Sequence, residues 1–540
     1  MNKTIFHFIL AGAIFSGCSH GHLEFMAVPE ITKNPNESVA LAGVLKFQTN
    51  RPVATKIILD CDDHSFTLSY DSTYNPSGGL PIIGMKPGRS YRVKILLQSA
   101  GEKLVYEKKL IFTTPELPSD PNEFPGFKVT TMEEGQIEPG ITLLNPRRRA
   151  TGQTRLNVNF GMLVAIDEMG EVIWYYRTNS RISDFNFLPN GHIAYMTQDF
   201  RLVEIDLLGN IINSWYASGR PYDPPQEGTP VKALTFHHDA FPMDNGNYLM
   251  LGSEYKAIEN YYTSETEEFA PRKTQNIMGD VIYEFNPAGE IIWDWHAFDH
   301  LDPMRIGYET FSGYWDRRGF SDIIDWSHAN TVLYDSADNT IMVNFRYLSS
   351  ILKIDRDSKD IKWIFGEPSG YADNLRSKLI GLDKGDWFWH QHSPSLSPDG
   401  TLFIFNNDNY KARPFDKISE TTLSYAAAYR INEEDLSAEL LWTSRIPGET
   451  GLASFAMGDV DWLESTSNIL VSYGALRPSK EFGHESSWSM IREYTYTNPA
   501  RVVWEMQIAS RNEDEGQSVG WTIFSAERLN NFVKSDQNHE

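Results

Sequence analysis

The sequence predicts an all-β protein in which a six-bladed β-propeller follows an N-terminal β-sandwich. Three observations lead to this prediction. A strand–turn–strand unit that usually ends in Trp recurs six times, short strands near the N-terminus alternate apolar and polar residues, and aromatic residues make up 13% of the chain. Alternation at period two is typical of half-buried strands, and a repeated four-stranded unit with variable loops is typical of propellers.

The first residues are interpreted as an export signal and not as part of the fold. Lys3 precedes an apolar run from Ile5 to Phe15, which is too short to cross a bilayer. The run ends in Ser16-Gly17-Cys18, which resembles a bacterial lipobox. We therefore expect residues 1–17 to be a lipoprotein signal peptide and Cys18 to carry the lipid. A plain cleaved signal with an incidental cysteine is the alternative.

This segment also predicts where the protein resides. A lipidated Cys18 would anchor the chain in the bacterial cell envelope, on the periplasmic side or at the outer membrane. No later stretch reaches the roughly 18 apolar residues of a membrane helix, so the lipid is the only membrane contact that we expect. Activated nucleotide cofactors of the cytosol would not be available in that compartment.

Residues 36–118 are predicted to form the β-sandwich, and residues 18–35 a tether before it. The phrase Met85–Tyr91, followed by a strand and Phe112–Pro115, resembles the end of a fibronectin type III domain. We therefore expect a sandwich of the fibronectin-III or immunoglobulin-like type. Four alternating runs support it, namely Val44–Phe47, Thr55–Leu59, Tyr91–Leu97 and Leu110–Thr114.

Residues 119–530 are predicted to form the propeller, with a polar tail at 531–540. Each repeat after the first has a further pair of strands before it, and the first repeat lacks one of these strands. The segment Trp521–Ser525 is expected to supply that strand and close the ring, which removes an open sheet edge. The six copies are Leu163–Trp174, Leu202–Ile212, Ile282–Trp293, Leu352–Trp363, Ala428–Trp442 and Glu493–Trp504.

Charge and cysteine content exclude some classes of protein. The chain has 48 Lys and Arg against 72 Asp and Glu, a formal net charge of −24. Nucleic-acid binding depends on cationic side chains that replace counterions, so this surplus of acids argues against a nucleic-acid partner. The two cysteines, Cys18 and Cys61, provide no disulfide framework.

Three histidines occupy the same place in three blades. His238 and His392 each precede the turn glycine of their blade by eight residues, and His328 has the same rank in the blade between them. Equivalent positions of a ring converge on its axis, so we expect these imidazoles to meet at the central channel. Arg346, on the strand after His328, is the expected cationic neighbour.

Such a cluster has more than one chemical interpretation. Neutral imidazoles can ligate zinc, copper or iron, which would make the protein a metal-dependent hydrolase or oxygenase. A fixed guanidinium repels a metal cation, however, and its planar donors suit an oxyanion. A sulfate or phosphate ester therefore fits better, with histidine as nucleophile, acid or base. A non-catalytic envelope propeller that binds a partner is the third interpretation.

The motifs resemble those of the bacterial aryl-sulfate sulfotransferases that do not use an activated nucleotide sulfate. The resemblance covers most of the chain and depends on four elements. These are His237-His238-Asp239, His328 with Asn330, Arg346, and Gln391-His392. It implies a six-bladed propeller with an N-terminal sandwich, and a homodimer.

The resemblance also implies the chemistry and the role of each residue. A phenolic sulfate ester would give its sulfuryl group to a phenolic acceptor through a sulfohistidine, without a cofactor. His392 would be the nucleophile, and His328, Asn330 and Arg346 would donate to the sulfuryl oxygens. Either His237 or His238 would be the remaining site histidine. The equivalence with His392 favours His238, which leaves His237 beside the substrate.

Overall fold

The computed structural model describes residues 22–150, 157–449, 452–511, 519–530 and 532 of the 540-residue chain. The predicted signal peptide and Cys18 lie outside these residues and stay predictions. Nearly all regular structure is β-strand, which confirms the all-β class. Within the described ranges, no helix has the length and apolarity needed to cross a membrane.

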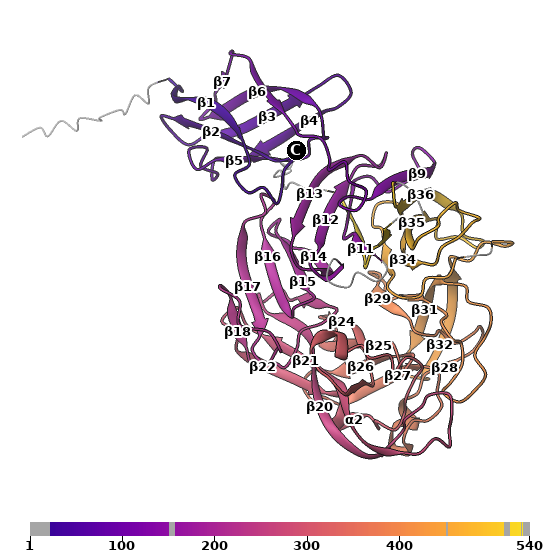
Figure 1. Ribbon diagram of the computed structural model, residues 1–540. Coiled ribbons are helices and arrows are strands. Elements are labelled where there is room, and N and C mark those ends of the chain that lie inside the picture. Colours follow the sequence, from indigo (N-terminus) through magenta and orange to yellow (C-terminus); the bar gives the residue numbers. More distant parts are fainter. Residues whose placement is uncertain (1–21, 151–156, 450–451, 512–518, 531, 533–540) are drawn as a thin grey trace, which may run out of the picture.

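The N-terminal domain consists of two sheets packed face to face (Figure 1). In the strand β6 (Ser90–Ser99), side chains alternate between buried and more exposed positions along most of its length, as the sequence pattern predicts. One sheet contains β1 (Phe25–Lys33), β2 (Gly43–Thr49) and β5 (Leu80–Ile82). The other contains β3 (Ala54–Asp60), β4 (Ser65–Tyr70), β6 (Ser90–Ser99), β7 (Glu102–Val105) and β8 (Leu110–Thr113).

The predicted tether is wrong for part of its length, because β1 lies within it. β1 pairs with β2 at the edge of its sheet, and the pairing register shifts twice, between Phe25 and Ala27 and between Ala27 and Glu30. Each shift inserts a residue and breaks the period-two alternation. Most β1 side chains are also exposed, so the pattern of a half-buried strand is absent from the sequence.

The domain packs against the propeller through apolar and polar contacts, and Val39, Ala42 and Ile83 belong to the same buried cluster as Trp174. The Asn34 side chain donates to the Leu208 carbonyl at 2.8 Å. Lys86, whose side chain is only 8% exposed, forms an ion pair with Asp167 at 3.0 Å. Both partners lie on turns of the propeller, so the two domains pack directly against each other.

Six sheets of four or five strands follow in the described chain and surround a central channel (Figure 1). We call them blades 1 to 6 and give their strands from the channel outward. Blade 1 contains β38 (Ala526–Leu529), β10 (Ile141–Leu144), β12 (Gly161–Ile166) and β13 (Val172–Thr178). Blade 2 contains β14 (Ile182–Phe187), β15 (Ile193–Thr197), β16 (Arg201–Ile205), β17 (Ile211–Ala217) and β18 (Thr229–Val231). Blade 3 contains β19 (Ala240–Pro242), β20 (Tyr248–Tyr261), β21 (Lys273–Phe285) and β22 (Ile291–His296), and β23 (Ile323–Asp325) pairs with β21.

The other three blades repeat this order, and the innermost strands of successive blades contact one another. Blade 4 contains β24 (Ala329–Asp335), β25 (Thr340–Phe345), β26 (Ser350–Asp355) and β27 (Ile361–Gly366). Blade 5 contains β29 (His392–Leu396), β30 (Leu402–Asn406), β31 (Tyr425–Asn432), β32 (Ser437–Thr443) and β28 (Gly381–Leu382). Blade 6 contains β33 (Asp459–Trp462), β34 (Ile469–Leu476), β35 (Trp488–Tyr494), β36 (Val502–Ala509) and β9 (Gly126–Met132). The short helices α2 (Ala297–His300), η1 (Asp316–Arg318) and η2 (Asp373–Lys378) lie in loops.

The recurring tryptophans connect neighbouring blades. The indole N–H of Trp174 donates to the Leu207 carbonyl of the next blade at 2.9 Å. Trp504 of blade 6 donates likewise to Glu168 of blade 1, at 2.9 Å. Trp215 and Trp293 repeat the contact between the blades in the middle of the chain. The ring-rich composition therefore reflects blade-to-blade packing, to which these four indoles add a hydrogen bond to a backbone carbonyl of the next blade.

The strand that closes the ring lies further along the chain than predicted. β38 pairs antiparallel with β10, whereas Gly520–Thr522 forms β37 and pairs with β11 (Arg147–Arg149). Trp521 does not line the channel. It is fully buried, and its ring packs against Phe160. The closing strand has the polar sequence Ala-Glu-Arg-Leu, as suits a strand beside the channel.

The predicted polar tail also contributes to the core. Phe532 is buried and contacts the rings of Trp174 and Phe187, with centroid distances of 5.5 and 5.9 Å. A single aromatic residue among polar neighbours gives no periodic signal, so composition alone could not place it.

One end of the channel is strongly acidic. A cavity of about 580 Å³ lies where the inner strands end, and it is lined by Asp184, Asp239, Asp459, Asp461 and Glu527. Burial raises the pKa of Asp239 to about 7, that of Asp459 to about 6 and that of Glu527 to about 8. The pKa values of Asp184 and Asp461 are also raised, by burial and by the neighbouring carboxylates.

These raised values predict that stability falls as the pH rises. Below about pH 4 the carboxyl groups are protonated in both states, but above it the unfolded chain releases protons that the folded chain retains. Stability is therefore lost between about pH 4 and pH 8. We expect Glu527→Gln to gain about 1–2 kcal/mol at pH 8 and little at pH 4, measured by urea unfolding. The exposed Glu439→Gln is the control, and an equal gain at both pH values would contradict the prediction.

Candidate active site

The opposite end of the channel contains a cavity of about 410 Å³ where the inner strands begin. His238, His328, Arg346 and His392 all line it, so the structure brings together the four residues that the sequence places at the axis. His238 and His328 have φ angles of 58° and 51°. Residues other than glycine seldom adopt this left-handed backbone, and such strained residues cluster at functional sites.

His392 is held in a single tautomer. Its Nδ1–H donates to Oδ1 of Asn407 at 2.6 Å. The Asn407 amide cannot turn round, because its nitrogen donates to the carbonyls of Ser454 and Met457. Nε2 of His392 therefore carries a lone pair, and it accepts a long hydrogen bond of 3.2 Å from the Met457 N–H. Burial, followed by repulsion from Arg346, lowers the pKa of His392 well below its usual value, so the ring is neutral.

His328 is paired with a carboxylate. Its Nδ1–H donates to Oδ2 of Asp325 at 2.5 Å, and Oδ1 of Asp325 accepts from the Trp315 indole at 2.9 Å. The imidazole stacks on Tyr347 with a centroid distance of 4.3 Å. A carboxylate on one imidazole nitrogen fixes the ring and stabilises its protonated form. Nε2 of His328 is therefore suited to give and take a proton.

His238 belongs to a chain of hydrogen bonds with a fixed direction. Nε2–H of His237 donates to the Gly252 carbonyl at 3.0 Å, so Nδ1 of His237 accepts from Nδ1–H of His238, also at 3.0 Å. Nε2 of His238 is then an acceptor, 3.4 Å from the Tyr314 hydroxyl. Burial and repulsion from His328 hold the pKa of His238 well below its usual value. The ring is neutral.

Arg346 is buried and forms an ion pair with Glu309, which lies on the loop between α2 and β23. Burial alone would raise the pKa of Glu309, but Arg346 holds it well below its usual range. Nη2 of Arg346 donates to the Phe455 carbonyl at 3.4 Å, and Nε has no hydrogen-bond partner among the described residues. A buried donor without a partner next to a cavity is suited to an oxyanion.

Two predicted substrate-binding residues do not line the cavity. Asn330 is fully buried, and its amide nitrogen donates to the Gln391 carbonyl at 3.0 Å. It therefore holds the backbone next to His392. His237 is buried as well and orients His238. His237 directly precedes His238, and neighbouring residues of an extended chain point in different directions. The Asn330 side chain is instead directed at the Gln391 backbone.

The structure adds cavity residues that the sequence motifs do not identify. Glu309, Tyr314, Tyr347, Phe455 and Phe524 line it on loops and at strand ends outside the histidine repeat. Five arginines also line it, namely Arg147, Arg148, Arg149, Arg181 and Arg318, together with Arg317 at the edge. In the sequence, these arginines are marked only by the basic run at 147–149 and the basic pair at 317–318.

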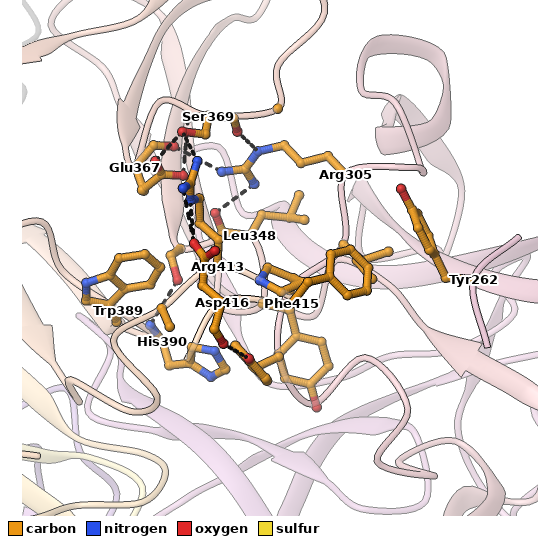
Figure 2. Close-up of a pocket in the computed structure, with 18 of the residues that line it drawn as sticks. Tyr262, Arg305, Leu348, Glu367, Ser369, Trp389, His390, Arg413, Phe415 and Asp416 are labelled. Atoms are coloured by element: carbon orange, nitrogen blue, oxygen red, sulfur yellow. Dashed lines mark hydrogen bonds and ion pairs between the residues drawn. The ribbon is translucent and has the colours of Figure 1, made fainter. Parts of the chain in front are cut away.

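A second cavity, of about 350 Å³, lies beside the first and shares Tyr347 with it. Figure 2 shows its lining, in which the Arg305 guanidinium reaches three backbone carbonyls and Arg413 lies against Asp416. None of the predicted site residues lines it. The cationic groups here already have partners, unlike the Nε of Arg346.

The described ranges contain no group of three or more His, Cys, Asp or Glu side chains arranged to hold a metal ion. The three site imidazoles are close to one another, with His238 and His328 centroids 4.7 Å apart. Nδ1 of each ring is already hydrogen-bonded, in His392 to Asn407, in His328 to Asp325 and in His238 to His237. The arrangement is therefore one of oriented imidazoles around a guanidinium.

The fold and this cavity define a β-propeller protein with an anion site of imidazole and guanidinium groups at one end of its channel. The family model described as Arylsulfotransferase (ASST) matches residues 127–517, and the chain belongs to this family. This confirms the family that the histidine and arginine motifs predict.

Two relatives are arylsulfate sulfotransferases. The chain is 26% identical over 207 residues to arylsulfate sulfotransferase AssT of Escherichia coli O6:H1, covering 30% of this chain and 34% of that protein. It is 25% identical over 205 residues to AssT of Lelliottia amnigena, with the same coverage. The matched region thus spans about a third of these relatives. The WD40 β-propeller domain of Doa1 covers 78% of this chain and 93% of its own, with 10% identity and a TM-score of 0.30.

Proposed function

We propose that the protein transfers a sulfuryl group from a phenolic sulfate ester to a phenol through a sulfohistidine on His392, without a nucleotide cofactor. The observation that carries the proposal is the fixed tautomer of His392. Its neutral ring directs the Nε2 lone pair toward a cavity that also contains the unpaired Nε of Arg346. Membership of the arylsulfotransferase family supports it.

In the first half-reaction the lone pair of His392 Nε2 attacks sulfur, and the weak hydrogen bond from Met457 is given up. The bond between sulfur and the aryl oxygen breaks, and its electron pair remains on the phenolic oxygen. Nε2–H of protonated His328 gives that oxygen its proton, and Asp325 stabilises the charged ring beforehand. Arg346 donates to the sulfuryl oxygens, where charge is concentrated.

The second half-reaction is the reverse with a new phenol. Its hydroxyl gives its proton to Nε2 of His328 while the oxygen attacks sulfur. The bond between sulfur and His392 Nε2 breaks, and the electron pair returns to the imidazole. Both steps use the same acid–base residue, and the covalent intermediate gives ping-pong kinetics.

Aryl esters suit this site because phenolate is a good leaving group. A phenolic oxygen has a pKa of about 10, far below that of an alcohol. The rings of Tyr314, Tyr347 and Phe524 line the cavity next to the imidazoles and can hold an aryl group by stacking. The His238 ring beside them is neutral, and its Nε2 can accept a hydrogen bond.

The test is the release of 4-nitrophenol from 4-nitrophenyl sulfate with and without added phenol. We expect phenol to accelerate release by at least about tenfold and to appear as phenyl sulfate in equal amount, because it removes the sulfuryl group from His392. Double-reciprocal plots against both substrates should be parallel. If the rate of 4-nitrophenol release did not depend on phenol and the product were free sulfate, the protein would be a hydrolase. If no aryl sulfate were cleaved, the proposal would be contradicted.

A further inference from the structure

The outer half of the cavity is lined by four guanidinium groups that the sulfuryl chemistry does not use. Arg147 and Arg149 lie on β11, Arg181 lies between β13 and β14, and Arg318 ends η1. They come from the two-stranded sheet of β11 and β37, from the connection between blades 1 and 2, and from the long loop of blade 3. Elements far apart in the sequence therefore direct positive charge toward one space.

These arginines have no carboxylate partner among the described residues. Arg147 donates to the Met457 sulfur, Arg181 to the Asn157 carbonyl and Arg318 to the Tyr314 carbonyl, and none of the three forms an ion pair. Arg149 lies over the Phe455 ring at 4.3 Å. In a chain of net charge −24, a cationic side chain usually has an acid within reach, as Arg492 has Glu449 and Glu505.

The four groups also repel one another. Burial, followed by Arg181 and Arg318, lowers the pKa of Arg147 well below its usual value. Burial and repulsion from Arg318 lower the pKa of Arg181 to about 10, so it stays charged at neutral pH. Within the described lining of the cavity, Glu309 is the only acidic side chain, and Arg346 already holds it. Uncompensated positive charge of this kind is relieved when an anion binds.

Aromatic rings separate the arginines from the imidazoles. The Arg318 guanidinium lies 3.5 Å from the centroid of Tyr314, whose other contacts are His238 and His328. The Arg147 guanidinium lies 5.9 Å from the Phe524 centroid, and Phe524 lies 6.4 Å from the His392 ring. The arginines are therefore about one aromatic ring further out than the groups that would hold the sulfuryl group.

We propose that Arg147, Arg149, Arg181 and Arg318 form a second anion subsite, which selects aryl sulfates and phenols that carry a further anionic substituent such as a carboxylate. The inference rests on the proposed function for the identity of the first anion. The sulfate ester lies at His392 and Arg346, the aryl ring lies among Tyr314 and Phe524, and the second anion meets the arginines.

Binding of stable sulfonates tests the subsite without any turnover. 4-Sulfobenzoate carries the second charge, and 4-sulfobenzamide is its matched neutral partner. By titration calorimetry we expect the full-length protein to bind the carboxylate at least about tenfold more tightly, a difference of about 1.4 kcal/mol. Arg147→Gln and Arg181→Gln should each reduce this ratio to about three or less, and added salt should reduce it too. Arg430→Gln, on the exposed surface beside Glu439, is the control and should leave the ratio unchanged.

A kinetic comparison separates this inference from the proposed function. With 4-nitrophenyl sulfate as donor, 3-(4-hydroxyphenyl)propionate should exceed its amide in kcat/KM by a similar factor. This factor should fall in Arg147→Gln and stay unchanged in Arg430→Gln. A binding ratio near one in the wild-type protein, or one that both variants leave unchanged, overturns the subsite. A high ratio without any sulfuryl transfer supports the subsite and contradicts the sulfotransferase.

Discussion

Replacing His392 by asparagine is expected to lower the turnover of 4-nitrophenyl sulfate by about 10⁴-fold or more, because the variant lacks the atom that accepts the sulfuryl group. The amide nitrogen of Asn at this position can replace Nδ1 of His392 as the donor to Asn407, so the local packing is disturbed little. The wild-type protein mixed with donor alone should gain the mass of one sulfuryl group per chain. Peptide mapping should place that group on His392, and added phenol should remove it.

The control is His300→Asn, because His300 stacks on Trp295 in blade 3, outside the cavity lining. It should keep wild-type turnover, and both variants should keep the wild-type melting temperature. If His392→Asn turned over donor at the wild-type rate, or if the label were found on another residue, the nucleophile would be wrongly assigned. If His392→Asn lost turnover because it did not fold, the melting curve would show it. In that case His392→Gln is used to repeat the test.

The sequence identifies the site residues that share a rank in the repeat. His238, His328 and His392 converge because corresponding residues of a ring face one axis, and the structure places all three on one cavity. Asn330 and His237 were placed in the same site, but each is directed away from it. Rank in a blade gives the position of the backbone, whereas the direction of a side chain depends on the local φ and ψ, which are left-handed at His238 and His328.

The partners of these histidines could not be found in the same way. Asn407 meets His392 because β29 and β30 pair in a register that shifts next to His392. Asp325 reaches His328 through the left-handed turn at His328 itself. The arginines of the cavity come from β11, a loop and η1, which have no counterparts in other blades. Only the fold brings such residues together.

The same distinction applies to the fold. The tryptophans that mark the repeat are regular because they pack between blades, and in four blades the indole also donates to a carbonyl of the next blade. β1 and β38 do not show the period-two alternation, for different reasons. β1 is interrupted by register shifts, and β38 is a polar strand beside the channel. Periodicity therefore identifies strands that bury one face, and it misses strands at an edge or a channel.

The second large effect is expected at His328, and it should depend on the leaving group. His328→Ala removes the proton donor, so turnover of phenyl sulfate should fall by about 10²–10⁴-fold. Turnover of 4-nitrophenyl sulfate in its first half-reaction should fall far less, because 4-nitrophenolate departs without a proton. Single-turnover release of each phenol, followed after rapid mixing, measures the two effects separately from the second half-reaction.

Asp325→Asn is the matched variant, because it keeps the size of the side chain and removes the charge that stabilises protonated His328. The loss of turnover in Asp325→Asn should depend on the leaving group in the same way. It should be smaller than the loss in His328→Ala, because the imidazole is still present. Added imidazole should restore part of the phenyl sulfate turnover in His328→Ala, where a small base can enter the vacated space, and not in His392→Asn. Equal losses for the two donors would mean that His328 only positions the sulfuryl oxygens and does not supply the proton.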